Sequence, residues 1–193
     1  KRYSNLTPEK TKVGLFGMGR IGKIFAKYLS FLGYEVGYYS RSKKNFNKKY
    51  KYFKSLQKLI NYSQIISIHV PLNENTRNLF DKKTLNLLKN KYVINTSRAE
   101  IMDEPILLNL LKKKYIKGAG VDVFKFEPTI NSSASLRNLK NVVSTSHNAA
   151  YDDVTLIKMY NKSINHIEKF FEKKYWNILS EKNVNIKFDD HNK

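Results

Sequence analysis

Residues 17–22 read Gly-Met-Gly-Arg-Ile-Gly, directly after the apolar run Lys12–Phe16. A second apolar stretch, Ile21–Phe31, follows them. A strand before a glycine-rich turn and a helix after it form the setting in which such turns bind the pyrophosphate of a dinucleotide. The free amides and partial positive charge of the helix start favour an anion there. The sequence therefore predicts a dinucleotide-binding turn, although an ordinary strand-to-helix turn can carry the same short pattern.

The three glycines of this stretch have separate tasks. Gly17 permits the tight bend, Gly19 lets the backbone approach a pyrophosphate, and Gly22 lets the helix pack closely on the strand. Arg20 and Ile21 stand at the helix start and belong to the same predicted phosphate site.

Length and composition set outer limits. The 193 residues are enough for one sizeable core. Without cysteine the chain forms no disulfide and no thiolate metal site, which fits a reducing compartment, so we expect the cytoplasm. No stretch reaches the roughly 20 apolar residues of a membrane helix, and we expect no membrane partner. The histidines and carboxylates lack metal-ligand spacing, so no metal site is predicted.

The formal net charge of +20 comes from 36 Lys and Arg against 16 Asp and Glu. Such a balance ordinarily suggests nucleic acid or an anionic surface as a partner. The lysines are spread along the chain in short runs, however, which is typical of solvated faces. We therefore expect no nucleic-acid partner, and a charge-driven nucleic-acid binder stays open only as an alternative. A basic field also attracts phosphorylated cofactors.

Beyond the glycine turn, predicted strands alternate with predicted helices. Strands are expected at Glu35–Tyr39, Ile65–Val70, Tyr92–Asn95, Ala119–Val123 and Val142–Ser144, and helices at 55–61, 82–88, 105–114 and around Leu136. Ser55 and Asp81 are the expected caps of the first two of these helices. Residues 40–51 are expected to form a polar loop, and Gly118 to close the helix before it. This alternation predicts an α/β fold with a doubly wound parallel sheet.

A long amphipathic helix is predicted after the sheet. Asp152 or Asp153 can cap it, and apolar residues recur on one face, namely Val154, Ile157, Tyr160, Ile164, Ile167 and Phe171. From Trp176 the chain turns polar and aperiodic. We therefore assign residues 1–175 to a dinucleotide-binding domain and residues 176–193 to a C-terminal tail.

Three polar side chains come shortly after predicted strands, where open parallel sheets bind their ligands. They are Arg98, Glu127 and His147. Singly, Arg98 is explained as a surface cation, Glu127 as a solvated loop residue, and His147 as a hydrogen-bond partner of the following helix. Together they predict one site at the edge of the sheet.

Several segments together resemble the D-isomer-specific 2-hydroxyacid dehydrogenase family. They are Gly17–Gly22, His69–Leu72 with Thr76, Val93–Arg98, Gly118–Phe124 with Glu127 and Pro128, and His147. The resemblance covers most of the chain. It implies a Rossmann-type domain and an NAD(P)-dependent oxidoreductase that transfers hydride between nicotinamide and a small 2-oxo or 2-hydroxy acid, such as glyoxylate or hydroxypyruvate.

The resemblance also implies roles for four residues. His147 donates a proton to the substrate carbonyl during reduction and removes it in the reverse reaction, and a carboxylate at Glu127 favours the imidazolium and orients the ring. Arg98 grips the carboxylate and carbonyl of the substrate with its planar guanidinium. Asp122 is similar to the family residue that contacts the nicotinamide carboxamide.

The predicted cofactor site draws on several strand ends. Its members are Gly17, Gly19, Arg20, Ile21, Gly22, Ser40, Arg41, Ser42, His69, Val70, Pro71, Thr76, Thr96, Ser97, Asp122 and His147. For His69, a cofactor-lining role and a purely structural role are both open.

The loop after the second strand bears on the choice of cofactor. An NAD-preferring member usually carries an acidic residue there for the ribose hydroxyls. Residues 40–44 instead read Ser-Arg-Ser-Lys-Lys. Arg41, assisted by Ser40, Ser42 or Lys43, favours NADP(H), with NAD(H) as the alternative. A solvated lysine-rich loop is the ordinary explanation.

The sequence departs from the family pattern near both catalytic residues. Ala99 stands where Gly usually follows the arginine, and Ser146 stands where Pro usually precedes the histidine. Family members also carry a substrate domain before the dinucleotide turn, and only sixteen residues precede Gly17 here. We therefore expect this chain to bind a dinucleotide but to turn over substrate poorly alone, and residues 176–193 to be a return segment toward that domain.

Family members usually form homodimers through the cofactor domain, and we expect the same here. The alternative to an enzyme is a nicotinamide-sensing interaction protein without turnover, similar to corepressors that share this fold. Such corepressors keep residues similar to Arg98, Glu127 and His147, but an obvious peptide-binding extension is missing from this sequence.

Overall fold

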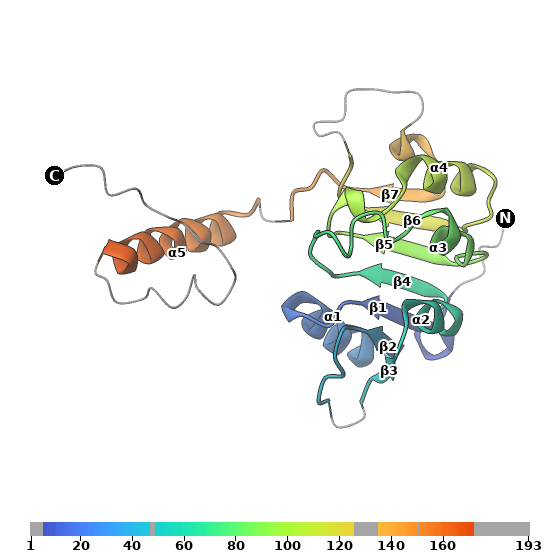
Figure 1. Ribbon diagram of the computed structural model, residues 1–193, viewed down its shortest axis with the longest axis horizontal. Helices are drawn as coiled ribbons and strands as arrows, with labels where there is room; N and C mark the ends of the chain where they lie inside the picture. The colour runs from blue at the N-terminus through green and yellow to red at the C-terminus, as the bar shows by residue number, and fades with distance from the viewer. Residues whose placement is uncertain (1–5, 47–48, 126–134, 150, 172–193) are drawn as a thin grey trace. The chain divides into compact units, whose positions relative to one another are not determined.

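The computed structural model describes residues 6–46, 49–125, 135–149 and 151–171. The chain forms two compact units, Lys1–His147 and Asn148–Lys193. The first unit carries the sheet, and the described part of the second unit carries one helix (Figure 1). The predicted division at residue 175 stays a prediction, since residues 172–193 lie outside the described part of the chain.

Within the described residues, the sheet has seven parallel strands in the order β3-β2-β1-β4-β5-β6-β7 (Figure 1). The strands are β1 Lys12–Phe16, β2 Glu35–Tyr39, β3 Lys51–Phe53, β4 Ile65–Ile68, β5 Tyr92–Asn95, β6 Gly118–Val121 and β7 Val142–Ser144. Phe16 pairs with Tyr39 on one side and with Ile68 on the other, so the carboxyl ends of β1, β2 and β4 are level. The doubly wound parallel sheet is therefore confirmed.

The α-helices are α1 Arg20–Phe31, α2 Leu56–Tyr62, α3 Lys82–Asn86, α4 Glu104–Lys112 and α5 Asp153–Phe171, and short 3₁₀ turns lie at Pro8–Lys10, Ala99–Ile101 and Leu136–Asn138. The predicted caps form as expected from short polar side chains. Ser55 accepts a hydrogen bond from the Lys58 amide at 3.3 Å, and Asp81 accepts one from the Thr84 amide at 2.8 Å.

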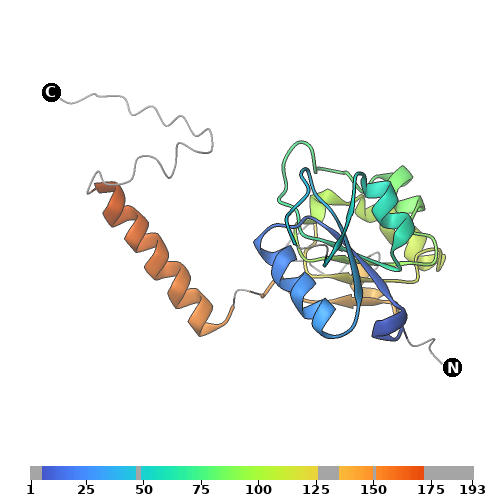
Figure 2. The same ribbon diagram turned by 90° about the horizontal axis from the view of Figure 1, so that it is seen from below.

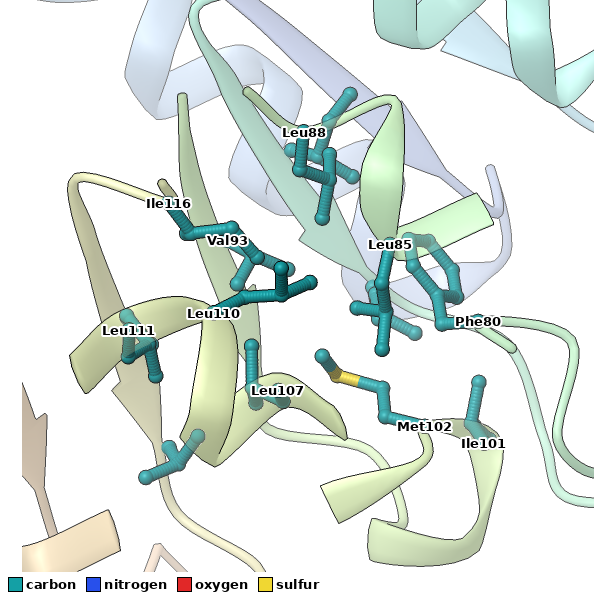
Figure 3. Packing of buried hydrophobic residues seen from close by; sticks show 14 of the residues in the cluster. Phe80, Leu85, Leu88, Val93, Ile101, Met102, Leu107, Leu110, Leu111 and Ile116 are labelled. Atoms are coloured by element: carbon teal, nitrogen blue, oxygen red, sulfur yellow. The ribbon is translucent and has the colours of Figure 1, made fainter. Parts of the chain in front are cut away.

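The two faces of the sheet are covered by different helices. The apolar side of α1 packs with alternate residues of β1 and β2 in one cluster, which includes Val13, Leu15 and Leu29. Helices α2, α3 and α4 pack on the other face around a larger cluster, part of which is drawn in Figure 3. Figure 2 shows the blue α1 and the teal and green helices on opposite sides of the sheet. This arrangement leaves the carboxyl ends of the strands for ligands.

Several predicted boundaries are wrong, among them the end of β6, which lies at Val121 and not at Val123. Strand β3 begins at Lys51 inside the residues assigned to a polar loop, and it pairs with β2 from Gly37 onward. Strand β4 ends at Ile68, two residues before the predicted end at Val70. Gly118 starts β6 instead of closing α4, because Lys114 adopts the left-handed backbone (φ 55°) that ends the helix.

Helix α5 has the predicted amphipathic pattern. Asp152 is its cap, since a carboxylate oxygen accepts a hydrogen bond from the Thr155 amide at 2.9 Å. Each residue of the predicted apolar face is more than half exposed in the described part of the second unit, from Ile164 at 53% to Phe171 at 77%. None of the described helices is long and apolar enough to cross a membrane.

The sheet core generates a stability prediction. Ile66 lies on β4, is fully buried and belongs to the larger cluster, so Ile66→Ala should lower the free energy of unfolding by about 2–5 kcal/mol through lost contacts and a cavity. Val143 on β7 is 75% exposed, and Val143→Ala should change it by less than about 0.5 kcal/mol. Urea denaturation followed by circular dichroism measures both. Equal midpoints for the two variants would contradict the assigned core.

Candidate dinucleotide-binding site

The turn between β1 and α1 requires glycine at two positions for reasons internal to the fold. Gly17 has φ +104°, and a Cβ there would lie 2.4 Å from the carbonyl oxygen of His69. A Cβ on Gly22 would lie 2.4 Å from the carbonyl oxygen of Gly17. Real Cβ atoms do not approach oxygen this closely, so both glycines let the start of α1 press against the ends of β1 and β4.

Gly19 differs from its two neighbours in the motif. Its φ is −77°, which suits any residue, and a Cβ there would meet no atom within 4 Å. The protein itself therefore leaves open space at this point, directly before the first turn of α1. That turn has no acidic residue and no side-chain cap. An exposed helix start without a carboxylate is suited to an anion such as a pyrophosphate.

A cavity of about 550 Å³ extends from this turn along the carboxyl ends of β1, β2 and β4. Nine predicted cofactor residues line it, namely Gly17, Gly19, Ser40, Arg41, Ser42, His69, Val70, Pro71 and Thr76. Seven further lining residues were not predicted, namely Phe16, Met18, Tyr39, Lys44, Asn73, Asn75 and Leu79. Most of these seven residues lie next to predicted ones in the sequence. That adjacency is the signal by which sequence reasoning could have found them.

The cavity wall is basic. Arg41 and Lys44 contribute cationic side chains, and the lining described above contains no Asp or Glu. The Ser40 hydroxyl donates to the Ser42 carbonyl at 2.7 Å, and the Lys44 ammonium donates to the Ser42 hydroxyl at 3.1 Å. Lys43, which the sequence offered as the assisting lysine, lines a separate hollow of about 1070 Å³ and not this cavity. Lys44 is the lysine that reaches the cavity.

His69 makes structural contacts and also lines the cavity. It lines the cavity, while its ring lies 5.3 Å from the Phe25 ring of α1 and its Nε2 lies 2.9 Å from the Ser67 hydroxyl. Burial lowers the pKa of His69 to about 4. The ring is therefore neutral at pH 7 and adds no charge to the cavity.

Thr76 shapes the loop that follows β4. Its hydroxyl donates to the Pro71 carbonyl at 2.7 Å and accepts from the Asn73 amide at 2.9 Å. These bonds fold residues 71–76 into a compact wall of the cavity. A threonine hydroxyl can bind two main-chain groups at once because it is both donor and acceptor.

A buried asparagine organises the loop that carries Arg98. The Asn95 side chain donates to the Arg98 carbonyl at 2.9 Å and accepts from the Ser97 amide at 3.0 Å. The Ser97 hydroxyl bonds the Val70 carbonyl, which ties this loop to the end of β4. Arg98 itself is exposed, and its guanidinium donates to the Ser97 carbonyl at 2.6 Å. Asn95 was not singled out from the sequence.

Asp122 connects the end of β6 to His147. It is buried, and one carboxylate oxygen accepts from the His147 amide at 3.0 Å and from the Thr145 hydroxyl. His147 adopts the left-handed backbone, with φ 55°. Its backbone conformation is thus fixed by Asp122 and not by the family's usual proline, which is replaced by Ser146.

The remaining predicted residues are distributed as follows. Arg20, Ile21 and Gly22 form the first turn of α1 without lining the cavity, and the same holds for Thr96, Ser97, Arg98, Asp122 and His147 on the loops after β5, β6 and β7. Arg98 and His147 follow strands on either side of β6. Glu127 lies outside the described residues. Among those described, no group of three His, Asp or Glu side chains is arranged to hold a metal ion.

The glycine turn predicts a contrast between two alanine substitutions. Alanine gains up to about 1 kcal/mol over glycine inside a helix. A Cβ only 2.4 Å from the Gly17 carbonyl oxygen should outweigh this gain, so Gly22→Ala should destabilise the protein by about 1–3 kcal/mol. Gly19→Ala meets open space and should leave the melting temperature nearly unchanged. Thermal denaturation of both variants decides, and a more stable Gly22→Ala would show that the close approach does not exist.

The neutral His69 predicts a pH dependence of stability. Its pKa is about 4 in the folded protein and 6.5 when solvated, so the unfolded chain binds more protons between these values. The free energy of unfolding should therefore rise between about pH 4 and pH 6.5 and level off above that range. The lowered carboxylate pKa values of Asp81 and Asp152 act below this window. Urea titrations across the range should give a flatter profile for His69→Gln, and an unchanged slope would argue against a buried neutral ring.

Comparison with known proteins identifies the domain. Residues 1–149 match the model of the D-isomer specific 2-hydroxyacid dehydrogenase, NAD binding domain. A glyoxylate reductase of Thermococcus litoralis is 40% identical over 141 residues, which are 70% of this chain and 41% of that protein. The chain spans about half the length of the curated relatives it matches, for example 49% of a glyoxylate reductase from Aeropyrum pernix.

Solved structures agree with this assignment. D-Lactate dehydrogenase from Aquifex aeolicus, complexed with NAD and lactic acid, has a TM-score of 0.79 at 26% identity, over 86% of this chain and 55% of that one. An acyclic imino acid reductase in complex with NADPH and D-Arg has a TM-score of 0.76 at 30% identity, over 87% of this chain and 53% of that one. The chain therefore belongs to the D-isomer-specific 2-hydroxyacid dehydrogenase family, with a Rossmann-type domain that binds NAD(P).

Proposed function

We propose that this protein is a nicotinamide-dependent oxidoreductase that interconverts a small 2-oxo acid and the corresponding 2-hydroxy acid. The observation that carries the proposal is the turn at Gly19, where the fold leaves open space before an uncapped helix start, next to a cavity lined by Arg41 and Lys44. Space, amide donors and cations together suit a dinucleotide pyrophosphate.

The residues around the cavity suit the pyrophosphate and the adenosine part of the cofactor. The first-turn amides of α1 would hold the pyrophosphate, and the loop from Ser40 to Lys44 would hold the adenosine ribose. When bound, the nicotinamide supplies or accepts the hydride. Solved relatives include complexes with NAD and with NADPH. We propose a preference for NADP(H), because cations and hydroxyls, rather than a carboxylate, surround the ribose position.

The proposed chemistry of the substrate uses four side chains. Arg98 binds the carboxylate of the 2-oxo acid, since its exposed guanidinium offers further donors beyond the one on the Ser97 carbonyl. His147 gives a proton to the carbonyl oxygen during reduction, and Asp122 holds its main chain in place for this task. Glu127 is the carboxylate proposed to orient the His147 ring.

The proposal extends to the substrate, the assembly and the compartment. A glyoxylate-like acid is proposed because the relative from Thermococcus litoralis bears the name glyoxylate reductase. A homodimer is proposed because α1 exposes an apolar row, with Ile21, Ile24, Tyr28 and Phe31 all more than half accessible. The cysteine-free sequence fits the cytoplasm.

Titration with the two cofactors tests the proposal. NADPH should bind the chain more tightly than NADH, and Arg41→Asp should weaken NADPH by about ten- to a hundredfold, because a hydrogen bond to a charged group contributes about 1.5–3 kcal/mol. Quenching or enhancement of the reduced-nicotinamide fluorescence gives the dissociation constants. Lys140→Asp, on an exposed residue after the short turn Leu136–Asn138, makes the same charge change and should leave both constants nearly unaltered.

Two results would count against it. If neither cofactor binds, the proposed function is wrong. If NADH binds better and Arg41→Asp has no effect, the proposed NADP(H) preference is wrong while the family membership stands.

A further inference from the structure

We propose that Tyr38 is a positioning residue for cofactor selection, and that its hydroxyl fixes Lys44 as a second cation for the 2′-phosphate beside Arg41. The inference rests on the proposed function, since it requires NADP(H) to occupy the cavity. It adds two residues, Tyr38 and Lys44, to the set that discriminates between the two cofactors.

Tyr38 is a buried residue that contacts the loop of residues 40–44. It is the second-last residue of β2, and its side chain is only 1% exposed. The ring packs between Phe46 and Tyr52, with centroids 5.7 and 5.4 Å away. A tyrosine so enclosed has little freedom, and its hydroxyl needs partners because a buried polar group without them is unfavourable.

Both partners of this hydroxyl belong to one residue. The Tyr38 hydroxyl accepts from the Lys44 amide at 2.9 Å and donates to the Lys44 carbonyl at 3.2 Å. The loop leaves β2 after Tyr39 and returns to this point five residues later. One buried side chain thus closes the loop and determines which residue stands at its end.

The fixed backbone decides which lysine faces the cavity. The Lys44 ammonium lies 3.1 Å from the Ser42 hydroxyl on the cavity wall. Lys44 lines both the cavity and the separate hollow, whereas Lys43 lines only the separate hollow. A shift of the loop by one residue would exchange the two lysines. The two hydrogen bonds of the Tyr38 hydroxyl prevent this exchange, because they fix both main-chain groups of Lys44 at one position.

A second cation matters for one cofactor more than for the other. A phosphate monoester carries about −1.5 to −2 charge at pH 7 and three acceptor oxygens, so it can engage Arg41 and Lys44 together. The 2′-hydroxyl of NAD(H) is uncharged and gains little from the second cation. Loss of Lys44 placement should therefore weaken NADPH selectively and reduce the ratio of the two affinities.

Tyr38→Phe tests this directly, because it keeps the ring and removes only the hydroxyl. We expect NADPH affinity to fall by about fivefold or more and NADH affinity to change less than about twofold, consistent with loss of one charged contact. Tyr34→Phe is the matched control, as Tyr34 packs against the same cluster and does not line the cofactor cavity. It should leave the ratio unchanged.

The double variant shows whether Tyr38 acts through Lys44. Lys44→Ala alone should lower NADPH affinity, and adding Tyr38→Phe should then cost little more. Additive losses, an equal loss for both cofactors, or an unchanged ratio in Tyr38→Phe would each overturn the inference. If the wild-type protein prefers NADPH and Tyr38→Phe keeps that preference, only this inference fails. If the wild-type protein has no such preference, both this inference and the proposed NADP(H) selection fail.

If Tyr38→Phe does not fold, single alanine variants of the two lysines test the inference instead. Lys44→Ala should reduce the NADPH-to-NADH affinity ratio, and Lys43→Ala should not. Equal effects of the two would show that the loop does not place Lys44 selectively, and would overturn the inference.

Discussion

The contact between the main chain of Gly17 and the carbonyl of His69 is the constraint on which the site depends. It brings the end of β1 against the end of β4, and only a residue without Cβ at φ +104° allows it. The approach of Gly22 to the Gly17 carbonyl then fixes where α1 begins. Because the sheet is in register across β1, β2 and β4, the helix start, the loop after β2 and the loop after β4 come to surround one cavity.

Much of the fold follows from local sequence patterns. Apolar runs bounded by caps located β1, β2, β5, β7 and the helix starts at Ser55 and Asp81, because burial and capping act on neighbouring residues. Strand β3 was missed for the opposite reason. Lys51-Tyr52-Phe53 is short and follows a lysine-rich loop, and it becomes a strand only through pairing with Gly37–Tyr39, which no local pattern reveals.

The site divides in the same way. Gly19, Arg41 and Thr76 were expected at the cofactor site because they lie in contiguous motifs, and all three line the cavity. Lys44 and Asn95 were not singled out, because their importance comes from where other side chains hold them. Asn95 places Arg98 through two bonds inside one turn, and the buried Tyr38 places Lys44 across the loop. In both cases the residue that positions the other is a buried polar side chain at the end of a strand. Its role can be recognised only once its burial is known.

Positive charge has two effects in this protein, one at long range and one at hydrogen-bonding distance. The net charge of +20 attracts every phosphorylated anion and is screened beyond about 8–10 Å at physiological salt. Such a field speeds the approach of both NADH and NADPH, and salt screening weakens the preference that it gives to the more highly charged NADPH. Discrimination requires cations fixed within hydrogen-bonding distance of the one group that differs. The hydrogen bonds between Lys44 and the Ser42 and Tyr38 side chains provide such fixation in the proposed site.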